Sequence, residues 1–149
     1  MALPSPSQLP FSEQPYWNAG VEQTPLQTSQ TLWQDYLACH KAGNWPAALQ
    51  LINQMLATAP QHAAHWRIKA KLHGALGHSA SCLLAIDTLL GLVPGDLDGL
   101  RMKAMYLHCH HEHEHALDIC RQVLSAHPQR SEFLHLKTSI LQSLQGTAP

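Results

Sequence analysis

Three prolines, Pro60, Pro94 and Pro128, follow one another at intervals of 34 residues in this chain of 149 residues. Because proline cannot continue a helix, each of them predicts the end of a helix and a turn into the next element. A constant interval of about 20–50 residues is typical of stacked repeats, each of which is one supersecondary unit. Taking the proline as position 32 divides the chain into three units and one further helix, which are 29–62, 63–96, 97–130 and 131–145.

The aligned units share apolar columns at helical spacing. Positions 4 and 11 hold mainly large side chains, which are Leu32, Trp66, Leu100 and Leu134 at position 4 and Cys39, His73, Leu107 and Leu141 at position 11. Position 8, between them, holds Tyr36, Ala70, Ala104 and Thr138. This spacing predicts a first helix, A, with one packing face.

A second helix in each unit, B, is predicted from columns of small and large apolar residues. Position 20 holds Ala48, Cys82 and Ala116, and position 28 holds Leu56, Leu90 and Leu124. Gly43 and Gly77 share position 15, between the two helices, where glycine can adopt the left-handed conformation that ends a helix. A single helical pair has too little core to be stable alone, so neighbouring pairs are expected to stack.

The period and the columns together resemble the tetratricopeptide repeat family over about residues 29–145. The resemblance implies an all-α fold, an α-solenoid of TPR-like helix–turn–helix hairpins closed by a capping helix. Three residues depart from the family pattern. Tyr36 replaces a small residue, His111 replaces the glycine of the turn, and His73 replaces a large aromatic or aliphatic residue. We therefore expect local repacking at Tyr36 and a less regular turn at His111.

Residues 1–28 differ from the repeats. They contain five of the ten prolines and only two charged residues, Glu13 and Glu22, which predicts an extended tail without a core of its own. Three aromatic residues interrupt this tail, namely Phe11, Tyr16 and Trp17. Two interpretations stay open: a flexible leader, or a segment that docks into its own groove, onto a partner, or into the groove of a second copy by self-association.

Charge and composition exclude several classes of function. The formal net charge is −1 with the 12 histidines counted as neutral, so the basic surface of a nucleic-acid-binding protein is not expected. No stretch reaches the ~18 apolar residues of a membrane span, and the N-terminus does not resemble a secretory signal. The four cysteines form no CxxC pair. We therefore expect a cytoplasmic protein with reduced thiols, without nucleic-acid or membrane partners.

The segment 131–145 is expected to form the capping helix. Ser131 is a suitable N-cap, and Glu132 lies where the positive end of the helix favours a carboxylate. We expect the leucines of this helix to face inward, which are Leu134, Leu141 and Leu144.

The resemblance also implies a binding surface, because the A helices of this family line the concave side of the stack. Carried over position by position, the groove residues are Trp33, Leu37, Lys41, Arg67, Lys71, Arg101, Met105 and His108. These include four of the nine Lys and Arg residues, so we expect a basic and partly apolar groove for an acidic or amphipathic protein segment. The alternative is that these charges only solvate an exposed helix face.

The function expected from this groove is a non-catalytic protein–protein interaction module, an adaptor or a chaperone-like escort. One subfamily grips the C-terminal carboxylate of its partner with Lys, Asn and Arg side chains. Trp33 and Leu37 stand where the first repeat would supply the Lys and Asn, so a clamp of that kind is not expected. No nucleophile-elbow, P-loop, dinucleotide or zinc-protease motif occurs, and we therefore predict no enzymatic activity.

A different class of function is suggested by the segment 108–115, HCHHEHEH, which contains five of the twelve histidines. Imidazole and thiolate are ligands for zinc, nickel or copper, and the candidate ligands are His108, Cys109, His111, His113 and His115. A dense mixed run is also typical of a solvated turn that binds metal only weakly. Clustered histidines titrate near neutral pH and repel one another once charged. Metal binding, or metal and pH sensing, is therefore the alternative function, and no other cofactor is expected.

Overall fold

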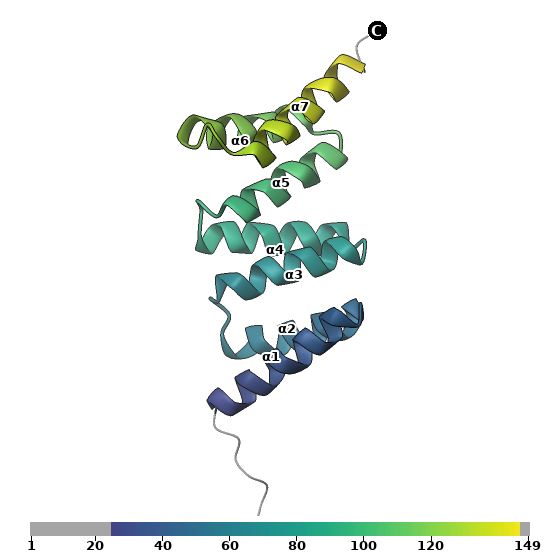
Figure 1. Ribbon diagram of the computed structural model, residues 1–149, viewed down its shortest axis with the longest axis vertical. Helices are drawn as coiled ribbons and strands as arrows, with labels where there is room; N and C mark the ends of the chain where they lie inside the picture. Colours follow the sequence, from purple (N-terminus) through teal and green to yellow (C-terminus); the bar gives the residue numbers. More distant parts are fainter. Residues whose placement is uncertain (1–24, 147–149) are drawn as a thin grey trace, which may run out of the picture.

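The structure is a computed structural model that describes residues 25–146, with side chains from Thr28 onward. Within these residues it is all-α, and seven helices stack along the long axis of the molecule (Figure 1). They are α1 (Pro25–Lys41), α2 (Trp45–Thr58), α3 (Ala63–Ala75), α4 (Ser79–Leu92), α5 (Leu97–Cys109), α6 (His113–Ala126) and α7 (Ser131–Gly146). The predicted α-solenoid of helical hairpins is confirmed. None of the described helices is long and apolar enough to cross a membrane.

The N-terminal predictions lie mostly beyond the described residues. Helix α1 begins at Pro25, inside the segment 1–28 that the sequence assigned to the tail. The docking of the segment that contains Phe11, Tyr16 and Trp17, and the self-association predicted from it, fall outside the part of the chain that the structure describes.

The helix boundaries recur with the predicted period. The B helices end at Thr58, Leu92 and Ala126, two residues before Pro60, Pro94 and Pro128. Their C-terminal backbone has the same shape each time, because the next amide donates a hydrogen bond of 2.8–2.9 Å to the carbonyl four residues earlier. The prolines therefore end each B helix and start the turn into the next repeat, as predicted.

The turns between A and B helices also share one geometry. Gly43, Gly77 and His111 all have positive φ, at 71°, 74° and 64°. The next amide in each turn, as in Glu112 N to Leu107 O at 2.9 Å, closes the same bond to the carbonyl five residues earlier. The expectation of a less regular turn at His111 is thus wrong. The hydrogen bonds of the turn outweigh the ~1–2 kcal/mol that a left-handed conformation costs an L-residue.

Three clusters of buried side chains follow one another along the stack. The first joins α1, α2 and α3 around Ile52, the second joins α3 and α4 around Ile86, and the third joins α5, α6 and α7 around Phe133. Tyr36 belongs to the first cluster and is 6% exposed, with its ring stacked on Trp33 at 5.1 Å. The Tyr36 ring fills the space of the usual small residue and packs against an aromatic neighbour.

Helix α7 packs in a different register from the one expected. Phe133 and Ile140 are fully buried, whereas Leu134 is 44% exposed and Leu141 is 37% exposed. The prediction that Leu134 and Leu141 face inward is wrong, and Leu144 is only half-buried. The residues at positions 4 and 11 lie on the face that an A helix turns toward the B helix of its own repeat. Helix α7 packs on the preceding helix α6 instead, and this contact buries Phe133 and Ile140, which lie one residue before Leu134 and Leu141.

Candidate partner-binding site

A broad hollow on the described surface lies between α3 and α5, beside the start of α4. Its volume is about 480 Å³. Its wall is mainly apolar and comes from α3, α4 and α5, including Ala70, Cys82, Met102, Met105 and Tyr106. Two basic side chains, Lys71 and Arg101, complete it. The structure therefore brings together three of the predicted groove residues, Lys71, Arg101 and Met105, around one hollow.

The basic side chains of this site gather around a single carboxylate, that of Asp98 at the start of α5. Arg67 Nε lies 3.6 Å, Arg101 Nη2 3.9 Å and Lys71 Nζ 4.0 Å from the carboxylate oxygens of Asp98. Arg67 and Arg101 therefore lie on the same side of the stack, as a groove requires. Asp98 also offsets part of the positive charge that the sequence predicted there.

Arg67 has a second acidic neighbour, which is buried. Its guanidinium pairs with the carboxylate of Asp96, whose side chain is only 7% exposed and whose Oδ1 accepts a 2.7 Å hydrogen bond from Gly99 N at the start of α5. Burial alone would raise the pKa of Asp96, but the hydrogen bonds from Arg67 and Gly99 outweigh it and hold that pKa below its usual value. Arg67 is thus held by a buried carboxylate, although its side chain is as exposed (31%) as that of Arg101 (32%), and Lys71 is the most exposed of the three cations at 52%.

The N-terminal part of the predicted groove is divided into smaller hollows. Trp33 borders one of about 290 Å³ together with Met55 and His65, and its ring stacks on His65 at 6.4 Å. Lys71 borders another of about 150 Å³ with Tyr36. Leu37, also on α1, is 49% exposed, and Lys41 lies exposed at the end of α1.

His108 lies apart from the hollow between α3 and α5. It borders a separate hollow of about 440 Å³ near α6 and α7, together with His111, His113 and Ser143. Its Nδ1 is 3.0 Å from Nδ1 of His113, across the turn. Burial, followed by the neighbouring His113 and His111, lowers the pKa of His108.

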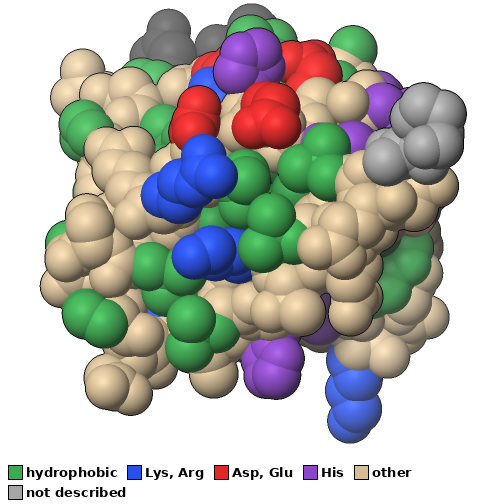
Figure 2. Space-filling view, turned by 90° about the horizontal axis from the view of Figure 1, so that it is seen from above, with side chains coloured by type: hydrophobic (Ala, Val, Ile, Leu, Met, Phe, Trp, Pro, Cys, Tyr) green, Lys and Arg blue, Asp and Glu red, His purple; other side chains and the backbone are tan. Residues whose placement is uncertain are grey.

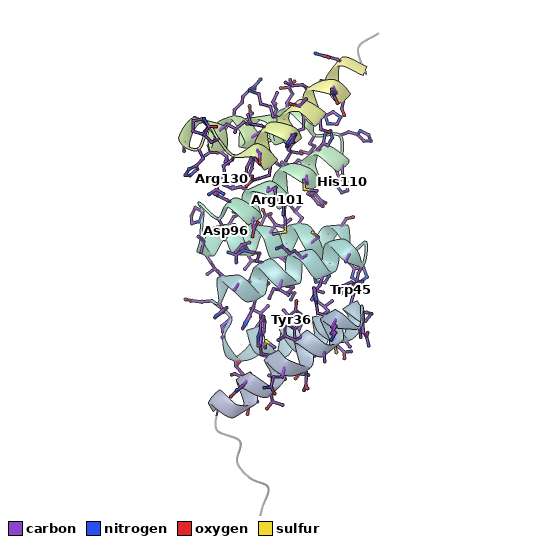
Figure 3. The ribbon with its side chains drawn as sticks, viewed as in Figure 1. Tyr36, Trp45, Asp96, Arg101, His110 and Arg130 are labelled. Carbon is purple, nitrogen blue, oxygen red and sulfur yellow. The ribbon has the colours of Figure 1, made fainter. Side chains whose placement is uncertain are left out.

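The histidine cluster is divided between the two sides of the third turn. His110 borders the hollow between α3 and α5, Cys109 borders both that hollow and the one of His108, and His115 pairs with Glu112 at 3.1 Å. Figure 3 shows His110 and Trp45 at the edge of the stack that holds the A–B turns. Among residues 25–146, no three His, Cys, Asp or Glu side chains are arranged to hold a metal ion. The described histidines instead lie close together in pairs, such as His108 with His113 and His73 with His78.

Sequence reasoning missed part of the hollow's wall. Met102 and Tyr106 on α5 and Cys82 on α4 border it but were not predicted as groove residues. The signal was present in α5, since Met102, Met105 and Cys109 recur at intervals of three and four residues on one helix face. All four cysteines, Cys39, Cys82, Cys109 and Cys120, are free thiols.

Comparison with known proteins identifies the fold. No protein-family model matches the chain, and no curated protein matches its sequence. Solved structures do match. The first TPR domain of Spaghetti (RPAP3), bound to the HSP90 peptide SRMEEVD, has 15% identity and a TM-score of 0.71 over 84% of this chain and 99% of that chain. The TPR2B domain of yeast Sti1, in a complex with pHsp70, has 16% identity and a TM-score of 0.66 over 77% of this chain and 97% of that one.

A third similar structure is the Sgt2 TPR domain from Aspergillus fumigatus, with 12% identity and a TM-score of 0.68 over 85% of each chain. At these identities the likeness concerns the fold alone. The chain folds as a tetratricopeptide-repeat solenoid, as its sequence pattern predicted.

Proposed function

We propose that this tetratricopeptide-repeat chain is a non-catalytic protein-interaction module that holds an acidic, amphipathic segment of a partner protein against α3 and α5. The observation that carries the proposal is the hollow of about 480 Å³, which combines an apolar wall with two basic side chains. A partner segment with one large apolar side chain and a nearby carboxylate would satisfy both parts of this surface.

The apolar wall suits an anchoring side chain. Met105 is 44% exposed, and methionine adapts its shape to the side chain that packs against it. An anchor that enters such a hollow typically contributes most of the affinity of an interface. Gly74 adds room, because a Cβ added at this residue would have a single heavy-atom neighbour within 4 Å among the described side chains, Cys82 Sγ at 3.8 Å.

The basic side chains would orient the acidic part of the partner. The side chains of Lys71 and Arg101 are 52% and 32% exposed, so both can reach a ligand. A carboxylate of the partner would share Lys71 and Arg101 with Asp98. The guanidinium of Arg101 can donate two parallel hydrogen bonds to such a carboxylate. Because Asp98 is already present, we expect these charges to contribute more to orientation than to affinity.

The similar structures support a peptide-like partner. The RPAP3 domain holds a peptide with three acidic residues, and the Sti1 domain is in complex with pHsp70. In this chain, the exposed Trp33 and Leu37 of α1 present apolar surface to a partner. We therefore propose an adaptor or escort for an amphipathic segment, without a clamp for a C-terminal carboxylate.

The test is a binding titration of the full chain with labelled helical peptides that carry one leucine face and one glutamate face. The double variant Lys71→Glu and Arg101→Glu should weaken binding at least tenfold, which corresponds to about 1.4 kcal/mol, because the two reversed charges would repel the glutamate face of the peptide. The matched control is Arg121→Glu, since Arg121 is exposed on α6 and away from the hollow. Equal binding by the double variant and the wild type, with unchanged helical circular dichroism, would exclude this groove as the site.

A further inference from the structure

Two histidines face each other across the turn between α5 and α6. His108 lies in the last turn of α5, His113 is the first residue of α6, and their Nδ1 atoms are 3.0 Å apart. The same contact recurs in the first repeat, where His40 and Trp45 stand at the same two repeat positions and pack edge to face with ring centroids 5.2 Å apart. The third repeat therefore places two imidazoles where the first places an imidazole and an indole.

The turn that carries this pair is closed by backbone hydrogen bonds. His111 N donates to His108 O at 3.2 Å, and Glu112 N donates to Leu107 O at 2.9 Å. The side chains of the pair are both half-buried. The backbone and the packing thus hold the two rings close together before any ligand binds.

We propose that His108 and His113 form a binding site for a divalent transition metal, Ni(II) or Cu(II), which joins the end of α5 to the start of α6. Imidazole binds such ions through a ring nitrogen, at a distance of about 2.0–2.1 Å. For two nitrogens 3.0 Å apart, this bond length gives an angle of about 94° at the ion. Square-planar and octahedral ions place neighbouring ligands at right angles, whereas a tetrahedral ion such as zinc would need nitrogens about 3.3 Å apart.

The protonation of the pair is compatible with this coordination. Without metal, the Nδ1–H of one ring can donate to Nδ1 of the other. Coordination needs both rings in the Nε2–H tautomer, so the Nδ1 proton moves to Nε2 of the same ring by way of water, and no proton is lost overall. Burial, followed by His113 and His111, lowers the pKa of His108. Its imidazole is therefore neutral at pH 7.5, which is the form that binds metal.

The hollow beside the pair has room for the other ligands of the ion. It measures about 440 Å³, and no Lys or Arg is among the described residues that line it, which are the pair, Cys109, His111 and Ser143. Water and the imidazole of His111 would complete the coordination. The ring centroid of His111 lies 5.7 Å from that of His113, and the His111 side chain is exposed, so it can turn toward the ion.

An ion in solution has access to this end of the stack. Figure 2 looks onto the α6–α7 end and shows histidine side chains at several places near the edge of that face, so imidazoles are open to solvent there. The other imidazole pair, His73 and His78, is less suitable. Its Nδ1 atoms are 3.4 Å apart, but His73 is only 9% exposed and the charge of Lys69 acts on it. A hydrated cation would have to lose most of its water to bind at this pair.

The first test is isothermal titration of the full chain with nickel chloride at pH 7.5. We expect one ion per chain, with a dissociation constant of about 10 µM. The double variant His108→Gln with His113→Gln should weaken binding at least tenfold, and His111→Gln should weaken it less. The matched control is His110→Gln with His115→Gln, which removes as many imidazoles from the same segment but keeps the pair. This control should bind nickel as the wild type does.

A second test uses the melting temperature, which reports on the folded pair. Nickel at about 1 mM should raise the melting temperature of the wild type by at least about 3 °C, because an ion that joins two helices binds the folded chain more tightly than the unfolded chain. The double variant should show no such rise. Either single substitution in the pair should weaken binding at least threefold, which keeps the titration decisive if the double variant is unstable.

Four results would overturn the proposal. The first is a wild-type chain that binds nickel no more tightly than about 100 µM. The second is binding that survives the loss of both His108 and His113. The third is an equal loss in the control variant, which would assign binding to the histidine-rich segment as a whole. The fourth is tighter binding of zinc than of nickel, which would contradict the angle that the pair imposes.

Discussion

Arg67 of α3 and Asp96, the N-cap residue of α5, form an ion pair that links α3 to the start of α5. The carboxylate of Asp96 also accepts a hydrogen bond from Gly99 N and thereby caps the N-terminus of α5. One buried side chain therefore stabilises the start of α5 and connects it to α3. Figure 3 shows Asp96 in the middle of the stack, near Arg101. The same pair explains why an arginine predicted for partner binding has a structural role here.

The first prediction concerns this pair. Asp96→Ala should destabilise the protein by about 2–3 kcal/mol, because it removes an N-cap and leaves Arg67 without its closest carboxylate. Asp96→Asn should cost less, since the amide oxygen can still cap α5. Urea unfolding measures both. As a control, Asp118→Ala in the exposed pair with Arg121 should change the unfolding free energy by less than about 0.5 kcal/mol. A similar loss at both sites would contradict the structural role of Asp96.

A second prediction follows from the left-handed backbone of His111. His111→Gly should stabilise the chain by about 0.5–1 kcal/mol, because glycine adopts this positive φ without strain. The gain is smaller than the full strain energy, because glycine also gives the unfolded chain more conformational entropy. The matched substitution is His110→Gly next to it, where φ is −94° and where glycine should destabilise. Thermal melts at pH 7.5 would compare the two. Destabilisation by His111→Gly would show that its imidazole contributes more than the turn conformation costs.

The third prediction concerns two glycines with different surroundings. At Gly99, an added Cβ would lie 2.9 Å from Leu90 Cδ2 and 3.1 Å from Leu89 Cδ2, so α4 and α5 approach closely there. Gly99→Ala should therefore cost about 1–3 kcal/mol of stability. The Cβ of Gly74→Ala would meet Cys82 Sγ at an ordinary contact distance of 3.8 Å, and this change should stabilise by about 0.5–1 kcal/mol, because alanine favours a helix interior.

The same site offers a way to fill the proposed groove. Gly74→Leu should enter the hollow between α3 and α5 and weaken peptide binding, while Gly74→Ala should leave binding nearly unchanged. Titration of both variants with the amphipathic peptides would show the difference. Full binding by Gly74→Leu would mean that the partner does not use this hollow.

The fourth prediction is a loss of stability in mild acid. Burial lowers the pKa values of His65, His73 and His108, and neighbouring charges, including His62, His78 and His113, lower them further. Between the folded pKa and the unfolded value of about 6.5, the unfolded chain binds more protons than the folded chain. The contribution of these three neutral histidines to the free energy of unfolding is therefore fully present above about pH 6.5, and it is lost as the pH falls through their folded pKa values.

Thermal melts at pH 7.5 and 5.5 would measure this loss. The triple variant His65→Gln, His73→Gln and His108→Gln should flatten the pH dependence of the melting temperature, even where it lowers the temperature itself. Replacing the exposed His127 and His135 by glutamine is the control and should leave the slope as it is. An equal slope in wild type and triple variant would assign the effect to other groups.

The stacking of hairpins could be predicted from the sequence because it depends on local rules. Proline ends a helix, small residues allow close packing, and both recur at one interval, so the helix boundaries followed. The turn at His111 shows the limit of residue preference alone. A histidine adopts the glycine conformation there because the backbone hydrogen bonds of the turn require it.

Features that depend on neighbours in space could not be read from the columns. The repeat alignment placed Leu134 and Leu141 in the core, because in the other repeats a B helix covers those positions. It also gave no sign that Arg67 pairs with Asp96, since a column gives the direction of a side chain but not the carboxylate that it meets. The division of the histidine segment between two hollows likewise depends on how α5 and α6 pack.

The order of contacts along the stack has a consequence for how the protein forms. Apart from a small contact between α5 and α7, the principal contacts join helices that are consecutive in the chain. Each newly synthesised hairpin can therefore pack on the hairpin before it as soon as its own residues have left the ribosome, because it needs no contact with a distant segment of the chain. Synthesis and assembly can proceed in the same direction, one repeat at a time.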